Sequence, residues 1–303
     1  MKNQTPNFGH SQKFSEQLFQ ISKLSYLKRR VFLKRAVKNP SSSFLYRYIS
    51  LNVNDDSSIE KLRDVIVNSR LWLSSREGFN DPFDTQAKVI IEGNPIQLRK
   101  KLNELYKRLE PNLIGVKRKT AIEKLMANQS LILKRVRNAT VDALSKVGAC
   151  CFTPDPRNLL MWSHYANQHK GLLLQFEIAK DTTTFLKTVT VDYVKDYPII
   201  NWANETEKEI HKAFLNKHDS WDYEKEVRII HPHGANTSLS FNAEALTGII
   251  FGCKASREIE NKIEELLAER KNKNKPPIKI YNALMHDSKY KIVIKRNTQS
   301  SPP

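Results

Sequence analysis

The chain has 303 residues, 40% of them hydrophobic, and a formal net charge of +18. This length allows one sizeable core with an additional small unit, and no apolar run approaches the roughly 18 residues of a membrane span. The N-terminus lacks the apolar segment of a secretory signal, and three cysteines are too few for a disulfide framework. We therefore expect a cytoplasmic protein with no membrane partner.

The positive charge is concentrated in two stretches. Residues 1–40 hold nine basic residues and one acid, and residues 95–140 hold twelve basic residues and three acids. Two interpretations are open, a surface that binds a polyanion such as nucleic acid or a solvated face that keeps the protein soluble. The residues expected to contact nucleic acid are Arg99, Lys100, Lys101, Lys117, Arg118 and Lys119.

The domain organisation follows from these shifts in composition. Residues 1–43 are predicted to form a basic arm, helical between Phe14 and Leu27, with a linker around Pro40. Residues 44–296 form an α+β core in which short, mixed strands are flanked by helices. Residues 95–147 are a basic helical insertion in that core, because leucines recur there at helical spacing. Residues 297–303 form a disordered polar tail.

The first strand of the core is predicted at residues 44–49, where Arg47 lies on the face opposite Tyr46 and Tyr48. Ser57 and Glu60 have the spacing of a capping box, which predicts a helix that starts at Ser57. Further strands are predicted at 71–75, 89–91, 185–194, 197–202, 249–252, 278–283 and 290–294, and helices at 205–215 and 256–270.

The segment 78–84 is predicted to be a loop, because Asn and Asp side chains bind their own backbone and Pro82 ends strand pairing. Asp81 and Asp84 are either turn-forming residues or, in a less favoured alternative, ligands of a metal ion.

Residues 148–178 are predicted to fold as strand, turn, short helix and strand. The apolar run 149–153 ends at two prolines, Asn158 is a candidate N-cap, and Gly171 precedes an apolar strand suited to the middle of a sheet. Such a helix, held between two strands, is a rigid support for functional side chains.

The segment 221–230 contains two acids and an arginine at alternate positions. In extended geometry Glu224, Glu226 and Arg228 share one face of a strand. They form either a ladder of ion pairs or a functional site.

The combination of these motifs resembles the bacterial family catalogued as domain of unknown function 2971, over residues 44 to 294. The motifs that carry the resemblance are Tyr46 to Tyr48, Phe79 to Asp84, Cys151 to Thr153, Met161 to Ala166, Tyr223 to Arg228, and Ile250 to Gly252. This family name implies kinship and no activity.

The order of the parts is also similar to that of ADP-ribosyltransferase-like domains of the arginine, serine, glutamate type. This resemblance implies NAD as the substrate, with Arg47 on its phosphates, Thr153 in place of the strand serine, Glu226 as the catalytic acid and Glu224 facing the acceptor. It implies a wider NAD-binding set formed by Tyr46, Phe79, Asn80, Asp81, Trp162, His164 and Tyr165. A carboxylate beside the ribose would stabilise the oxocarbenium character that develops when the nicotinamide bond breaks.

As a hypothesis, the chain is an ADP-ribosyltransferase-like enzyme that modifies a nucleic acid or a protein and serves as a toxin or phage-defence effector. The first alternative is a non-enzymatic module that binds nucleic acid through its basic helices. The second is a metal-dependent nuclease that uses Asp81, Asp84 and Glu226.

Overall fold

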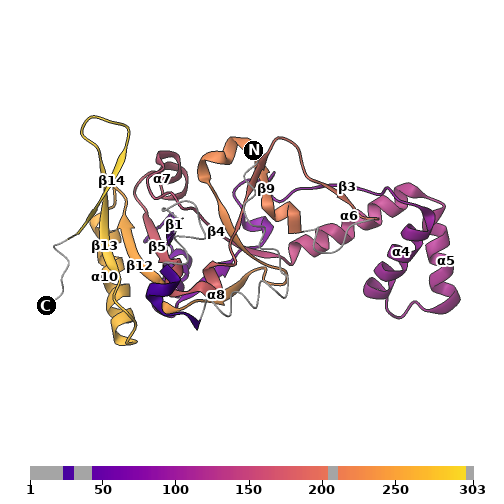
Figure 1. The fold of residues 1–303 in the computed structure, drawn as a ribbon, viewed down its shortest axis with the longest axis horizontal. Helices are drawn as coiled ribbons and strands as arrows, with labels where there is room; N and C mark the ends of the chain where they lie inside the picture. The colour runs from indigo at the N-terminus through magenta and orange to yellow at the C-terminus, as the bar shows by residue number, and fades with distance from the viewer. Residues whose placement is uncertain (1–22, 31–42, 204–210, 298–303) are drawn as a thin grey trace.

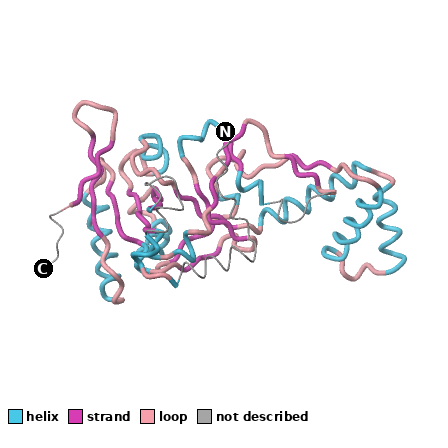
Figure 2. The backbone as a smooth tube through the Cα atoms, viewed as in Figure 1, coloured by secondary structure: helices cyan, strands magenta, loops and turns pink. Residues whose placement is uncertain are grey.

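The computed structural model describes residues 23–30, 43–203 and 211–297. It has the α+β architecture expected from the sequence, with a sheet-containing body and a helical lobe at one end (Figures 1 and 2). The helices predicted at 14–27 and 205–215 and the tail lie wholly or largely outside the described residues.

A five-stranded sheet with the order β1-β5-β12-β13-β14 is the main layer of the body. Its pairs are antiparallel except for the parallel pair β12–β13. Strand β5 lies between two neighbours, as its continuous apolar sequence predicts. The strands are β1 (Phe44–Ile49), β5 (Leu172–Glu177), β12 (Leu246–Phe251), β13 (Lys279–Met285) and β14 (Ile292–Arg296).

Both faces of this sheet are covered. Successive side chains of a strand point to opposite sides, and those of β5 are buried on both sides. Leu172, Leu174 and Phe176 of β5 join the core under helices α3 (Asp56–Arg63) and α10 (Arg257–Asn272). Leu173 instead packs with Trp162 of helix α7 (Leu159–Tyr165) on the other face.

A second sheet has the order β4-β10-β6 and adjoins the edge of the first. The two sheets meet where the backbones of Tyr46 and Thr153 exchange hydrogen bonds of 2.8 and 2.9 Å. The predicted succession of strand, turn, helix and strand is confirmed, but its two strands, β4 and β5, lie in different sheets. The strands of this second sheet are β4 (Gly148–Phe152), β6 (Val189–Thr190) and β10 (Val227–His231).

Three two-stranded ribbons complete the described strands, where the sequence predicts one core sheet. They pair β2 with β11, β3 with β8, and β7 with β9. Their bounds are β2 (Arg70–Leu73), β3 (Lys88–Ile90), β7 (Asp192–Val194), β8 (Ile199–Asn201), β9 (Asn216–His218) and β11 (Thr237–Ser240).

The basic insertion forms three helices that project from the body as a lobe (Figure 1). The lobe has its own core, in which Leu102, Tyr106 and Val136 are buried, and the β3–β8 ribbon leads into it. Its helices are α4 (Pro95–Leu109), α5 (Gly115–Met126) and α6 (Gln129–Ser145).

Three local predictions are wrong. The predicted strand 185–194 begins with the last residue of helix α8 (Thr182–Phe185) and contains two short strands, β6 and β7, that belong to different sheets. Helix α3 begins at Asp56 and its N-cap is Asp55, whose carboxylate accepts from the backbone N–H groups of Ser57 and Ser58. The segment predicted as one strand over 221–230 is a 3₁₀ turn, η6 (Asp219–Glu224), followed by Lys225 with φ of 46° and then by β10.

Candidate functional site

Five charged side chains form a buried cluster under the junction of the second sheet and the loop 78–84. Three are carboxylates and two are cations, so the cluster has one more acid than base. Its members are Asp84, Lys217, Glu224, Glu226 and Arg228.

Arg228 is fully buried at the centre of this cluster. Its Nε and Nη2 donate to the two carboxylate oxygens of Glu226 at 2.8 and 2.9 Å, and Nη1 and Nη2 donate to those of Asp84 at 3.0 and 2.6 Å. Nη1 also donates to the carbonyl of Phe214, and the ring of Phe79 lies 5.1 Å from the guanidinium carbon. The guanidinium therefore connects segments that are far apart in the sequence, and nearly all of its N–H donors make hydrogen bonds.

Glu226 is held as an anion by these contacts. Burial alone would raise its pKa, but Arg228, Lys217 and the Cys151 thiol lower that pKa to about 2. Both oxygens of its carboxylate accept from Arg228, and its backbone N–H donates to the Tyr193 hydroxyl at 2.8 Å. These contacts hold Glu226 in place immediately before the start of β10.

Glu224 has a different environment. Its oxygens accept from the Tyr165 hydroxyl and from Lys217 Nζ, each at 2.5 Å, and Asn80 Nδ2 donates to the same hydroxyl at 3.0 Å. Burial raises the pKa of Glu224, and nearby Glu226 raises it further against the opposing effect of Lys217. Glu224 is therefore the carboxylate of the cluster that is best suited to exchange a proton.

A cavity of about 880 Å³ lies directly above the cluster. Lys217 lines this cavity, although the residue is only 5% exposed. Asn80, which also lines it, donates to the Tyr165 hydroxyl, and that hydroxyl donates to Glu224. This volume is within the range of small-molecule sites. The lining also includes Asp81, Phe83, His164, Lys195, Tyr197, His218, Trp221 and Tyr223.

Aromatic rings follow one another along one wall of the cavity. The ring of Tyr223 lies between those of Trp221 and His164, at centroid distances of 6.0 and 6.3 Å. Lys217 Nζ lies 4.9 Å from the Trp221 ring. Aromatic rings can stack on the base of a nucleotide, and cations beside them can bind its phosphates.

The predicted NAD-binding and catalytic residues are divided between this cavity and other places. Asn80, Asp81 and His164 line the cavity, and Tyr165 binds Glu224 just behind it. Arg47 donates to Cys150 on β4, whereas the neighbouring Cys151 thiol bonds to Glu226. Adjacent strand residues face opposite ways, so Arg47 and Glu226 lie on opposite faces of β4.

The remaining predicted residues have structural contacts. Thr153 is buried and its hydroxyl accepts from the Asp155 backbone, and Tyr46 pairs with Thr153 through its backbone. Trp162 is buried against Tyr48 and donates to the Pro156 carbonyl. The predicted site residues did not include Lys217, Tyr193 or Trp221. Lys217 and Tyr193 come from segments with no motif of their own, whereas Trp221 begins the segment 221–230.

The acids of the alternative metal site are engaged elsewhere. Asp84 and Glu226 share Arg228, and Asp81 accepts from the Phe83 backbone as a turn-forming residue does. Within the described ranges, no three His, Cys, Asp or Glu side chains are arranged to hold a metal ion.

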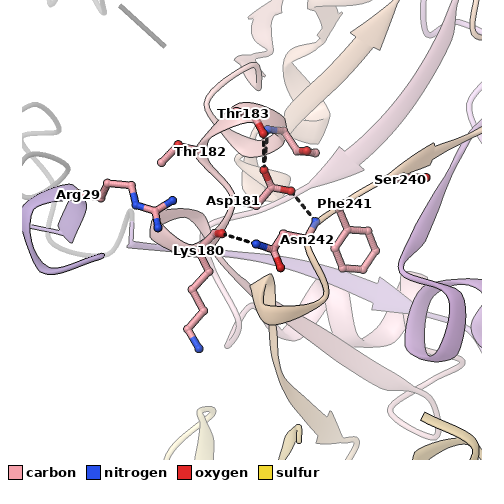
Figure 3. Close-up of a pocket in the computed structure, with 9 residues that line it drawn as sticks. Arg29, Lys180, Asp181, Thr182, Thr183, Ser240, Phe241 and Asn242 are labelled. Atoms are coloured by element: carbon pink, nitrogen blue, oxygen red, sulfur yellow. Dashed lines mark hydrogen bonds between the residues drawn. The ribbon is translucent and has the colours of Figure 1, made fainter. Parts of the chain in front are cut away.

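A smaller pocket of about 350 Å³ lies on another part of the body, between residues 180–184 and 240–242 (Figure 3). There the Asp181 carboxylate accepts from the Thr183 hydroxyl and from the Asn242 backbone, so its oxygens are satisfied within the protein. None of the predicted site residues lines this pocket.

Comparison with known proteins identifies one family. Residues 161–229 match the model described as protein of unknown function (DUF2971). This segment of the chain is similar to the DUF2971 family. The match supports the family resemblance over residues 161–229, which include most of helix α7, the aromatic wall, and Glu224 and Glu226 of the cluster. No curated protein and no solved structure matches the chain. No helix that the structure describes is long and apolar enough to cross a membrane.

Proposed function

We propose that this protein is an ADP-ribosyltransferase-like enzyme that binds NAD in the cavity of about 880 Å³. The observation that supports this proposal is a buried cluster with a surplus carboxylate beneath a wall of aromatic rings. The rings of Trp221 and Tyr223 offer stacking surfaces for adenine or nicotinamide, and the exposed Lys195 offers positive charge for the diphosphate.

The chemistry assigned to Glu224 follows from its position and charge. Breaking the bond between ribose C1′ and nicotinamide creates positive charge on the ribose, which the surplus negative charge of the cluster stabilises. Nicotinamide leaves as a neutral molecule, C1′ bonds to an oxygen or nitrogen of the acceptor, and the acceptor proton passes to Glu224. The raised pKa of Glu224 makes its carboxylate a stronger base than an ordinary one.

The proposal keeps NAD as substrate but changes the roles of individual residues. Glu224 replaces Glu226 as the reacting carboxylate, because Arg228 and Lys217 lower the pKa of Glu226 and hold it as an anion, whereas burial raises the pKa of Glu224. Lys195 replaces Arg47, which does not line the cavity. An enzyme of this kind, acting in the cytoplasm, would serve as a toxin or phage-defence effector.

The test is nicotinamide release from NAD by the purified protein, together with the affinity for NAD. We expect Glu224→Gln to lower the rate at least about 100-fold, and Trp221→Ala to weaken NAD binding about tenfold or more. Glu264→Gln, an exposed acid on α10, is the matched control and should leave both quantities unchanged. Full turnover by a folded Glu224→Gln protein, or no turnover by the folded wild type, would refute the proposal.

A further inference from the structure

The helical lobe presents lysines whose charge is not neutralised by neighbours. In α4 and α5, which the structure describes completely, Lys100 and Lys107 are exposed seven residues apart, and so are Lys117 and Lys124. Residues seven apart lie on one side of a helix. Lys119 is also exposed, and none of these five side chains has an ion pair or hydrogen bond in the described part of the chain.

The three acids of residues 95–140 offset these five lysines only in part. Glu123 already binds Arg99 and Glu110 already binds Arg135, which leaves Glu104 on α4 as a single acid near Lys100 and Lys107. Arg118 donates to the Leu113 carbonyl, so it supports the loop before α5. Of the six basic residues predicted from the sequence, Lys100, Lys117 and Lys119 are therefore the ones presented to solvent with no such partner.

The lobe and the cavity share one segment of chain. Val194 to Pro198 line the cavity, the next residues form β8, and Trp202 packs against the core of the lobe. Pro198 and Trp202 are four positions apart, which is at most about 14 Å of extended chain. The cavity lining and the core of the lobe are therefore neighbours, and a flexible polyanion held by the lobe lysines would reach the cavity along this segment.

From these observations we infer that the lobe binds the phosphate backbone of a nucleic acid and presents that nucleic acid to the cavity as the acceptor of ADP-ribose. The inference rests on the proposed function for the transfer step. In that step a nucleophilic oxygen or nitrogen of the nucleic acid bonds to ribose C1′, nicotinamide departs, and the proton of the nucleophile goes to Glu224. Pairs of lysines that repeat along one side of each helix, without ion pairs in the described residues, favour a periodic polyanion over a protein acceptor.

The binding half of the inference is tested with labelled single-stranded RNA and DNA of about 20 nucleotides, titrated between about 50 and 200 mM salt. Lys117→Gln, Lys119→Gln and Lys124→Gln together should weaken binding at least tenfold. The plot of the logarithm of the binding constant against the logarithm of the salt concentration should also become shallower, by about one unit of slope for each phosphate that the variant no longer neutralises. The matched control replaces Lys289, Lys291 and Lys295 by Gln at the β13–β14 hairpin, at the opposite end of the molecule (Figure 1). Equal effects of the two triple variants, or no binding by the wild type, would overturn the inference.

The acceptor half is tested by following NAD labelled in its adenylate phosphate. Label that enters RNA or DNA, and is reduced by the α5 triple variant while nicotinamide release without nucleic acid is unchanged, supports the inference. Label that enters protein instead would overturn the inference and leave the proposed function intact. Nucleic-acid binding with no NAD turnover would overturn the acceptor role together with the proposed function, and would favour the non-enzymatic module.

Discussion

At the scale of single residues, Arg228 determines whether the charge cluster is stable. It is the shared partner of two buried carboxylates, so its removal leaves Asp84 and Glu226 with Lys217 as their remaining cation. We expect Arg228→Met to lower the free energy of unfolding by about 3 to 5 kcal/mol. Chemical denaturation measures this change, and Arg257→Met, at an exposed arginine, should change it by less than about 0.5 kcal/mol. A decrease below about 1 kcal/mol for Arg228→Met would contradict the central role of this guanidinium.

Glu226 gives the cluster a pH dependence with a definite sign. Its pKa is about 2 in the folded chain against an ordinary 4.5. Because the unfolded chain binds this proton more readily, the stability contributed by the ionised carboxylate is fully present above about pH 4.5 and is lost as the pH falls toward 2. The shift corresponds to about 3 kcal/mol.

Denaturation of the wild type and of Glu226→Gln between pH 3 and 6 isolates this contribution from that of the other acids. The variant, although less stable at neutral pH, should lose less stability on acidification than the wild type. Parallel curves for the two proteins would show that Glu226 is not held as an anion by Arg228.

At the scale of secondary-structure elements, the start of helix α7 controls one wall of the cavity. Asn158 Oδ1 accepts from the backbone N–H groups of Leu160 and Met161, and its Nδ2 donates to the Tyr223 carbonyl at 2.8 Å. We expect Asn158→Ala to cost about 1 kcal/mol of stability through removal of the cap and to weaken NAD binding through the released Tyr223.

Asn158→Asp separates the two effects, because aspartate keeps the cap oxygen and lacks the amide donor. This variant should retain most of the stability and still bind NAD more weakly. Asn94→Ala, which removes the equivalent cap of α4 in the lobe, should lower stability and leave NAD binding unchanged. Wild-type NAD affinity in both Asn158 variants would show that the link to Tyr223 does not shape the cavity.

How well an element can be predicted depends on how local its determinants are. Strand β5 and helix α7 follow from apolar spacing, an N-cap and flanking glycine and proline, all within a few residues. The alternation at 221–230 predicts one strand, but Lys225 adopts a left-handed conformation and Glu224 ends a 3₁₀ turn. That turn is held by Lys217 and Tyr165, which come from other segments, so local periodicity does not reveal it.

The residues of the candidate site also differ in how far the sequence predicts them. Glu224, Glu226 and Arg228 stand out in the sequence, because two acids and an arginine at alternate positions are conspicuous on so short a segment. For Asp84 the sequence predicts a turn-forming residue or a metal ligand, whereas its pairing with Arg228 is a contact across 144 residues. Lys217 lies in a three-residue strand without any pattern, so only the three-dimensional fold could add it to the site.

At the scale of the whole molecule, the body and the lobe have separate hydrophobic cores. The body contains the large core under α3 and α10, whereas seven buried side chains form the core of the lobe. A smaller buried apolar area gives less stabilisation, so the lobe should open more readily than the body.

Hydrogen exchange at low denaturant concentration tests this expectation in the intact chain. Amides of α4 and α5 should exchange through openings of lower free energy than amides of β5 and β12. Trp202→Ala should increase exchange in α4 and α6 and leave β5 unchanged, because Trp202 packs on the core of the lobe. The Leu174→Ala control, in the core of the body, should have the converse effect.

If α4 and β5 exchanged with the same free energy in the wild type and in both variants, the lobe and the body would be one cooperative unit. A nucleic acid bound to the lobe would then also stabilise the floor of the cavity, and its addition should slow exchange in β9 as much as in α5.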